Sequence, residues 1–168
     1  MAAPAFVVMG VSGCGKSTVG QKLAQALHLQ YLEGDEFHPP ENVARMAAAV
    51  ALTDEDRQGW LLRLSERLAL AQAAGEGVVL SCSALKRAYR EVLRRGAPGL
   101  RLVHLQGSRE LLTARMAVRR GHYMPASLLE SQLATLQTPG DDESPLTFDV
   151  ALSPEAIVAA IVSRESHA

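Results

Sequence analysis

The sequence predicts an α/β fold in which a parallel β-sheet carries helices on both faces. Five short apolar runs alternate with helical patterns along 168 residues, and this alternation is typical of parallel strands joined by right-handed crossovers. In addition, a glycine-rich loop at residues 10–17 directly follows the first apolar run. A chain of this length forms one domain with a full hydrophobic core.

The strands are predicted where short apolar runs occur, as expected for strands buried on both faces. These runs are Phe6–Met9, Gln30–Glu33, Val78–Cys82, Leu100–Gln106 and Phe148–Leu152. Apolar residues also recur at helical spacing, for example at Trp60, Leu64 and Leu68. The predicted helices are Lys16–Leu27, Asp54–Ala74, Lys86–Arg95, Ser108–Arg120 and Pro154–Arg164. Ligands of such sheets bind beyond the carboxyl ends of the strands, so the residues that follow each strand are the candidates for a site.

Two inserts interrupt the alternation within the single domain of residues 1–168. Residues 39–53 precede the long helix, and residues 121–139 precede the last strand. We expect a short helix in each; in the second insert it is indicated by Leu128, Leu129, Leu133 and Leu136. Inserts at the ligand end of a small α/β domain often close over a substrate. We therefore expect a helical substrate-side insert at 39–53 and a lid at 121–139.

The loop after the first strand fits the pattern G-x-x-x-x-G-K-[ST], which binds nucleoside triphosphates. Its residues are Gly10, Val11, Ser12, Gly13, Cys14, Gly15, Lys16 and Ser17, and Thr18 follows in the helix. The glycines let successive backbone N–H groups turn toward phosphate, where a Cβ would block the approach. Lys16 adds a positive charge at the β- and γ-phosphates, and the Ser17 hydroxyl is a ligand for Mg²⁺. The positive end of the following helix faces the same phosphates.

Composition limits the possible partners and the location. The net charge of −1 shows no basic surplus, so a nucleic-acid partner is not indicated. Cys14 and Cys82 are spaced neither as a metal clamp nor as a disulfide framework, which indicates free thiols in a reducing compartment. The N-terminus lacks the basic start of a signal peptide, and no apolar run approaches the roughly 20 residues that span a bilayer. We expect a soluble, cytoplasmic protein that binds no membrane.

Three classes of phosphate-loop protein compete. A regulatory GTPase needs an Asn-Lys-x-Asp motif, which the sequence lacks, and the D-x-x-G match at residues 56–59 lies within a helical pattern. A motor or remodelling ATPase needs an acidic residue at the end of a strong apolar strand, where this chain has Cys82 and Gln106. A small-molecule kinase needs neither feature and fits a short chain with a lid-like insert. The kinase class is therefore favoured.

The acidic residue available to a kinase is Asp35, which follows the second predicted strand. In phosphoryl transfer the protein mainly positions groups and neutralises charge, and a carboxylate orients the attacking hydroxyl. Asp35 stands at the carboxyl end of a strand, where such a group belongs. The alternative for this residue is a turn or helix-cap aspartate.

Four ordered blocks of residues carry a resemblance over nearly the whole chain. They are the loop at 10–17, Gly34-Asp35 followed by His38-Pro39, Cys82-Ser83-Ala84-Leu85-Lys86 with Tyr89-Arg90, and Gly121-His122 followed by Ser131-Gln132. Between them stand Asn42, Met46, Leu52, Asp54, Asp56-Arg57 and Trp60-Leu61. In these residues the chain resembles the small, bacterial-type gluconokinases. The loop alone is common to many activities, whereas its combination with Cys-Ser-Ala-Leu-Lys and His-Pro is highly specific.

The resemblance implies a P-loop kinase that uses ATP and Mg²⁺ to phosphorylate D-gluconate at its 6-hydroxyl, giving 6-phospho-D-gluconate. It implies the fold of nucleoside monophosphate kinases, which is a five-stranded parallel sheet flanked by helices with a mobile lid, and a homodimer. Two other interpretations stay open. One is a kinase of the same fold for another small acceptor, such as shikimate or a nucleoside monophosphate. The other is a non-catalytic regulator that binds ATP.

Gluconate has several hydroxyls and one carboxylate, so its site needs cations and hydrogen-bonding groups. The candidates are Asp35, His38, Arg57, Lys86, Arg90, His122 and Gln132. For each of these taken alone, an ordinary solvated surface residue is the alternative. Lys16, Asp35 and Arg120 are the candidates for catalysis.

Three arginines end the helix that enters the predicted lid. Arg115 resembles the arginine that stacks on adenine in related kinases. Either Arg119 or Arg120 is expected to reach the transferring phosphoryl group when the lid closes. We assign Arg120 to that role and Arg119 to nucleotide binding. The sequence is equally consistent with the two roles exchanged. Cations favoured at a helix C-terminus are the alternative for one of the three.

The chain departs from the family pattern at a few positions. Ala49 and Ala51 stand where the family usually has Gly and Pro, and Gly59 stands where Pro is usual. These positions affect backbone stiffness in the substrate insert rather than reacting groups. Glu33 stands where aspartate is frequent, which leaves Asp35 as the preferred acidic candidate.

Overall fold

The computed structural model describes residues 3–118 and 127–166. Over these two ranges, five strands form one sheet in the order β2-β3-β1-β4-β5, and each neighbouring pair is parallel. The strands are β1 (Ala5–Met9), β2 (Gln30–Glu33), β3 (Val78–Ser81), β4 (Arg101–Gln106) and β5 (Leu146–Asp149). The predicted α/β fold with a five-stranded parallel sheet is confirmed.

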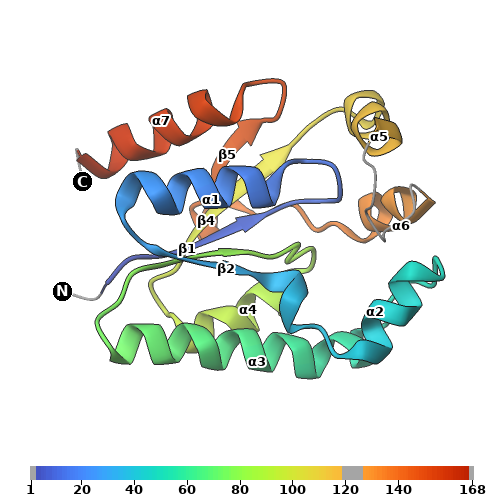
Figure 1. Cartoon of the computed structure of the whole chain (residues 1–168), viewed down its shortest axis with the longest axis horizontal. Helices are drawn as coiled ribbons and strands as arrows, with labels where there is room; N and C mark the ends of the chain where they lie inside the picture. Colours follow the sequence, from blue (N-terminus) through green and yellow to red (C-terminus); the bar gives the residue numbers. More distant parts are fainter. Residues whose placement is uncertain (1–2, 119–126, 167–168) are drawn as a thin grey trace.

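Helices cover both faces of this sheet (Figure 1). α1 (Lys16–Leu27) and α7 (Pro154–Ser166) lie on one face, and α3 (Asp54–Ala73) and α4 (Arg87–Gly96) lie on the other. Successive side chains of a strand point to opposite faces. In β1, Phe6 and Val8 therefore join the core under α1 and α7, whereas Val7 and Met9 join the core under α3 and α4. β1 is the central strand, since it pairs with β3 on one side and β4 on the other, and its carboxyl end leads into the glycine-rich loop.

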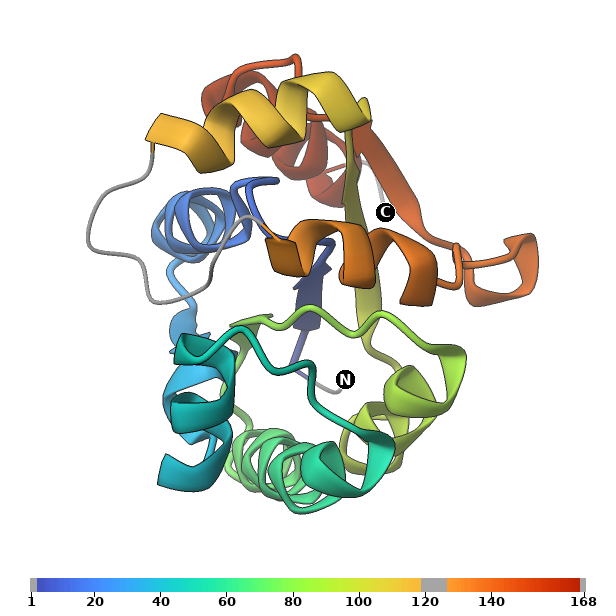
Figure 2. The same ribbon diagram turned by 90° about the vertical axis from the view of Figure 1, so that its right-hand side faces the viewer.

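The remaining elements gather at the carboxyl ends of the strands, as the end-on view shows (Figure 2). They are the short 3₁₀ turn η1 (Gly34–Phe37), α2 (Pro40–Ala47), α5 (Arg109–Val118), α6 (Ser127–Thr135) and the 3₁₀ turn η2 (Asp141–Glu143). The short helices that the sequence predicts in the two inserts are thus present as α2 and α6. The side chains that line the cavity described below come from this end of the sheet.

The last strand begins two residues and ends three residues earlier than predicted. The apolar residues Val150 and Leu152 suggested a strand over Phe148–Leu152, but β5 ends at Asp149. There the Asp149 side chain accepts a hydrogen bond from the backbone N–H of Ala151 (2.8 Å), and its carbonyl accepts one from Leu152 (3.1 Å). This local turn competes with extended backbone. Val150 still enters the core, whereas Leu152 is 49% exposed.

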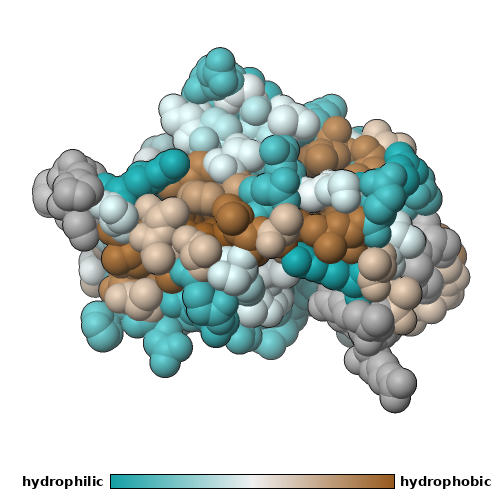
Figure 3. Space-filling model, turned by 90° about the horizontal axis from the view of Figure 1, so that it is seen from above, coloured by the Kyte–Doolittle hydropathy of each residue, from teal (hydrophilic) through white to brown (hydrophobic). Residues whose placement is uncertain are grey.

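The face formed by α1 and α7 carries an apolar band on its surface (Figure 3). A shallow hollow there is lined by Ala26, Val158 and Ala159, and an ion pair between Lys22 and Glu155 (3.3 Å) lies beside it. α7 is apolar around much of its circumference, so some of its apolar side chains reach the surface instead of the core. No helix within the described ranges is long and apolar enough to cross a membrane.

Candidate active site

The glycine-rich loop has the conformation that its sequence requires. Gly10 has φ +151°, and a Cβ on it would lie 2.6 Å from the Leu105 carbonyl oxygen and 2.7 Å from Cys14 Sγ. Gly13 has φ +85°, in the left-handed region that favours glycine. α1 begins immediately afterwards at Lys16, so its positive end faces the loop. This arrangement of backbone donors and helix terminus is suited to phosphate.

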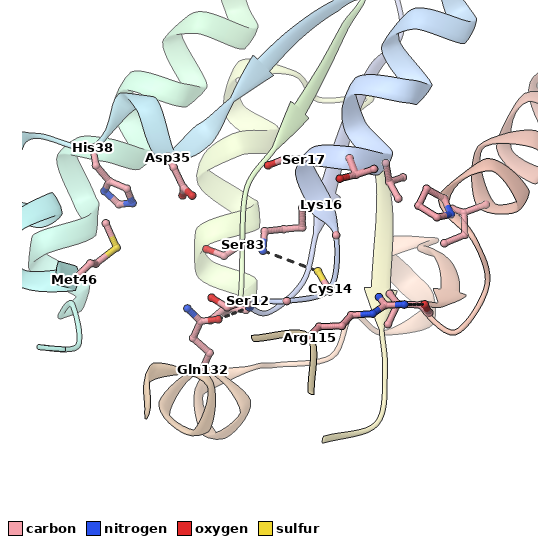
Figure 4. Close-up of a pocket in the computed structure, with 18 of the residues that line it drawn as sticks. Ser12, Cys14, Lys16, Ser17, Asp35, His38, Met46, Ser83, Arg115 and Gln132 are labelled. Atoms are coloured by element: carbon pink, nitrogen blue, oxygen red, sulfur yellow. Dashed lines mark hydrogen bonds between the residues drawn. The ribbon is translucent and has the colours of Figure 1, made fainter. Parts of the chain in front are cut away.

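A cavity of about 390 Å³ lies against this loop (Figure 4). Lys16 points into it from the start of α1, and Asp35 and Ser83 point into it from the segments that follow β2 and β3. It is lined by residues 12–19 of the loop and α1, by Asp35, His38, Met46, Leu52, Arg57 and Trp60, by Ser83 and Leu85, and by Arg115, Gln132, Val150, Leu152, Pro154 and Ile157. The cavity therefore joins a phosphate-binding loop to a polar region at the neighbouring strands.

Glu33 contacts the loop, a feature that the sequence interpretation passed over. Glu33 is the last residue of β2. Its carboxylate accepts hydrogen bonds from the Ser17 hydroxyl and from the Tyr31 hydroxyl (2.8 Å). Burial and the neighbouring Glu33 raise the pKa of Tyr31 to about 12, so this phenol stays a donor. The signal in the sequence was the position of Glu33 at the carboxyl end of a strand.

His38 is held against Trp60 on the side of the cavity away from the loop. The two rings stack with centroids 4.0 Å apart, and Trp60 Nε1 donates to the Gly34 carbonyl (2.8 Å). Burial, with a smaller effect of Arg57, lowers the pKa of His38 to about 4. The neutral ring accepts from Asn42 Nδ2 at Nδ1 (3.2 Å), which leaves the proton on Nε2 as a donor.

Arg57 is positioned by the start of α3. Thr53 and Asp56 form a capping box, in which Asp56 N–H donates to Thr53 Oγ1 (3.1 Å) and Thr53 N–H donates to Asp56 Oδ2 (2.9 Å). This cap fixes the first turn, and Arg57 extends from it into the cavity lining. Lys86 lies in a polar hollow beside the cavity, where its Nζ donates to Asp54 Oδ1 (2.9 Å).

The structure places Arg90 away from the cavity. Its side chain is 1% exposed, and its Nε and Nη2 donate to the Glu143 carboxylate (2.8 and 3.0 Å). Nη1 donates to the carbonyls of Ala84 and Leu85, and Nη2 also donates to that of Gln137. These bonds occupy the guanidinium within the chain, so we do not carry Arg90 into the acceptor site. Arg90 instead ties the β3–α4 loop to the segment that follows α6.

The lid side contributes two described candidates. Gln132, on α6, accepts a hydrogen bond at Oε1 from the backbone N–H of Ser12 (2.7 Å). Arg115, on α5, donates from Nη2 to the Val150 carbonyl (2.6 Å) and lines the cavity next to the β5–α7 turn. The remaining candidates, Arg119, Arg120 and His122, lie outside the described residues.

Comparisons with known proteins agree with this geometry. The family described as "AAA domain" matches residues 6–139. The chain is 47% identical to a gluconokinase of Gluconobacter oxydans over 157 residues, which are 94% of this chain and 88% of that protein. The chain belongs to the gluconokinase family. Family membership agrees with the kinase class favoured above over a GTPase or a motor ATPase.

Solved structures extend the gluconokinase comparison to the fold. A gluconokinase from Sinorhizobium meliloti is 48% identical with a TM-score of 0.83, covering 93% of this chain and 87% of its own. A sugar kinase from Janibacter is 45% identical with a TM-score of 0.92, covering 96% and 93%. The gluconokinase fold therefore extends over almost the whole chain.

Proposed function

We propose that this protein transfers the γ-phosphoryl group of ATP to the 6-hydroxyl of D-gluconate, giving 6-phospho-D-gluconate and ADP. The observation that carries this proposal is the 47% identity to a gluconokinase over 94% of the chain. The cavity supports it, because it joins the phosphate loop to a carboxylate, a neutral histidine and an arginine at Asp35, His38 and Arg57. A polyol with one carboxylate needs groups of these kinds.

The donor side is assigned to the loop and the lid. The loop and first turn at residues 10–18 form the ATP site, in which the backbone N–H groups of residues 13–18 hold the phosphates and Lys16 neutralises charge at the β- and γ-phosphates. Arg115 contacts the adenine, Arg119 the nucleotide and Arg120 the transferring group, and the insert at 121–139 acts as a lid. Arg115 lines the cavity, at the carboxyl ends of the strands where ligands of such sheets bind, whereas the roles of Arg119 and Arg120 rest on the family resemblance.

Mg²⁺ fits the oxygen donors next to the loop. Ser17 supplies a hydroxyl, and Glu33, which accepts its hydrogen bond, supplies a carboxylate. Within the described ranges, no group of three or more His, Cys, Asp or Glu side chains could hold a metal. That suits an ion that binds through one or two protein oxygens together with substrate phosphates and water. When bound, Mg²⁺ neutralises charge on the β- and γ-phosphate oxygens.

On the acceptor side, Asp35 orients the 6-hydroxyl of gluconate and accepts its proton. The oxygen of the 6-hydroxyl forms a bond to the γ-phosphorus while the bond between that phosphorus and the β,γ-bridging oxygen breaks. ADP leaves with the electrons of the broken bond. His38 donates from Nε2 to a substrate hydroxyl, and Arg57 binds the carboxylate. Lys86, His122 and Gln132 complete the proposed set, with the insert at 39–53 forming one wall.

The decisive experiment is ADP release by the purified protein with Mg-ATP across a panel of acceptors. The panel contains gluconate, related aldonates, shikimate and nucleoside monophosphates. We expect gluconate to be the preferred acceptor, and a Lys16→Ala variant to lose nearly all turnover. Turnover of other acceptors but not gluconate would refute the proposal, and ATP binding without acceptor-dependent ADP release would indicate a regulator. We also propose a cytoplasmic homodimer, and light scattering on the purified protein tests the dimer.

A further inference from the structure

Tyr89, on the first turn of α4, contacts both cations that we place on the acceptor side. Its hydroxyl accepts a hydrogen bond from Arg57 Nη1 (3.2 Å) and donates one to Asp54 Oδ1. Arg57 Cζ lies 5.5 Å and Lys86 Nζ lies 5.7 Å from the centroid of the Tyr89 ring. A single phenol side chain is therefore in contact with two cations and one carboxylate.

The contacts of Arg57 leave a defined part of its guanidinium unused. Both of its hydrogen bonds within the described chain come from one nitrogen, since Nη1 donates to the Leu52 carbonyl (2.7 Å) as well as to Tyr89. Within the described chain, Nε and Nη2 of Arg57 donate to no protein group. These two nitrogens form the edge of a guanidinium that binds a carboxylate through two parallel hydrogen bonds. Tyr89 thus binds Nη1, the guanidinium nitrogen of Arg57 that a carboxylate bound at Nε and Nη2 would not contact.

Asp54 accepts hydrogen bonds from both Tyr89 and Lys86. These hydrogen bonds from Tyr89 and Lys86 lower the pKa of Asp54. The hydrogen bond between Lys86 and Asp54 in turn raises the pKa of Lys86. Asp54 therefore compensates Lys86, its direct partner at 2.9 Å. Arg57 has no carboxylate partner of its own among the described ion pairs. Of the two cations, Arg57 also lines the main cavity, whereas Lys86 lines only the adjoining hollow.

We propose that Tyr89 is a positioning residue that holds Arg57 with its Nε–Nη2 edge available to the carboxylate of the acceptor. This inference rests on the proposed function and adds to it the residue that sets recognition of the acid group. Tyr89 does not line the main cavity, and its hydroxyl is hydrogen-bonded to Arg57 and Asp54 rather than to the phosphate loop. Its effect is therefore expected on the acceptor and not on ATP.

The test is Tyr89→Phe in the full-length enzyme, assayed with gluconate and ATP varied in turn. The substitution removes the hydroxyl and keeps the ring, which is 5% exposed and packs in the core under α3 and α4. Asp54 keeps its bond to Lys86, so the melting temperature should stay near that of the wild type. We expect KM for gluconate to rise about tenfold through loss of a hydrogen bond to a charged group, while kcat and KM for ATP change less than about twofold.

A double-mutant cycle separates positioning from a general structural effect. In an Arg57→Gln background, Tyr89→Phe should leave kcat/KM for gluconate almost unchanged, because the group it positions is gone. Equal losses in both backgrounds, or no loss in the wild-type background, would overturn the inference. Tyr31→Phe is the matched control: it removes a hydroxyl that donates to Glu33 at the nucleotide side and should leave KM for gluconate unaltered. A wild-type enzyme without gluconate turnover would instead refute the proposed function.

Discussion

Gln132 Oε1 accepts a hydrogen bond from the backbone N–H of Ser12 across 2.7 Å, and so joins α6 to the phosphate loop. The two residues are 120 positions apart in the sequence. α6 lies within the predicted lid at 121–139, and the segment after α6 is bonded to the β3–α4 loop, where Gln137 N–H donates to the Leu85 carbonyl (2.8 Å). The predicted lid is therefore bonded to the protein at two points: Gln137 contacts the β3–α4 loop, and Gln132 contacts the phosphate loop.

Gln132→Ala removes the contact and should lower kcat/KM for ATP about tenfold, the effect of losing one part-buried hydrogen bond at the site. Gln132→Glu keeps an acceptor for Ser12 but adds a negative charge near the phosphates, so its KM for ATP should rise further. Steady-state kinetics with ATP varied measure both. Ser131→Ala, on the exposed side of the same helix, is the control and should behave as wild type; wild-type kinetics for Gln132→Ala would contradict a role for this contact.

Glu33→Gln tests the proposed magnesium site. The amide keeps the shape of the side chain but removes the charge next to Ser17. Substitution of a group that supports a metal ligand typically costs roughly 10- to 100-fold in metal affinity. We expect the Mg²⁺ concentration for half-maximal activity to rise within that range, measured by titration at saturating ATP and gluconate. Glu33→Asp restores the charge and should recover most of the loss; an unchanged Mg²⁺ requirement in Glu33→Gln would place the ion elsewhere.

Arg90→Ala should unfold the protein more easily, because it leaves the Glu143 carboxylate buried without its main partner. Burial alone would raise the pKa of Glu143, but hydrogen bonds from Arg90 and Arg94 hold it at about 2. Removing one partner of a buried ion pair costs about 3–5 kcal/mol, which thermal or urea unfolding will detect. Arg94→Ala, whose side chain is 21% exposed, should cost much less. A stable Arg90→Ala variant with impaired gluconate binding would restore Arg90 to the acceptor site.

The contrast between Arg90 and Arg57 shows what the sequence could predict about the site. Both are cations in the first turns of helices within family motifs, and only the fold distinguishes them. Arg90 meets a buried carboxylate from a segment 53 residues away, whereas Arg57 reaches the cavity. Local patterns were sufficient for the loop, the order of strands and helices, and the short helices in the inserts. The contacts of Glu33, Tyr89 and Gln132 depend on tertiary packing, so no local pattern contained them.

Ala49 shows the same limit for the backbone. The sequence marks it as a departure from the family's usual glycine, and the structure gives the physical reason for that glycine. Ala49 has φ +62°, a left-handed conformation that costs an L-residue roughly 1–2 kcal/mol and glycine very little. The turn after α2 therefore keeps its conformation without the residue best suited to it.

We expect His104 to make the free energy of unfolding depend on pH. It lies on β4, is 1% exposed, and neither ring nitrogen has a hydrogen-bond partner among the described residues. Burial and the nearby Arg90 lower the pKa of His104 below its usual 6.5, so the unfolded chain binds this proton more readily than the folded one. The free energy of unfolding should therefore fall as the pH drops below about 6.5. The pKa of His38 is lowered from 6.5 to about 4, so His38 should further reduce the free energy of unfolding as the pH falls from 6.5 to 4.

His104→Leu removes the titrating group and keeps an apolar side chain of similar size. At pH 8 its free energy of unfolding should lie within about 1.5 kcal/mol of the wild type. At pH 5 the difference should shift in favour of the variant, by at most about 2 kcal/mol, since a proton no longer stabilises the unfolded chain. Urea unfolding at both pH values measures the shift. If the two proteins lose stability in parallel between pH 8 and 5, His104 is not the group responsible, and the decline must come from His38 or from groups that titrate elsewhere in the fold.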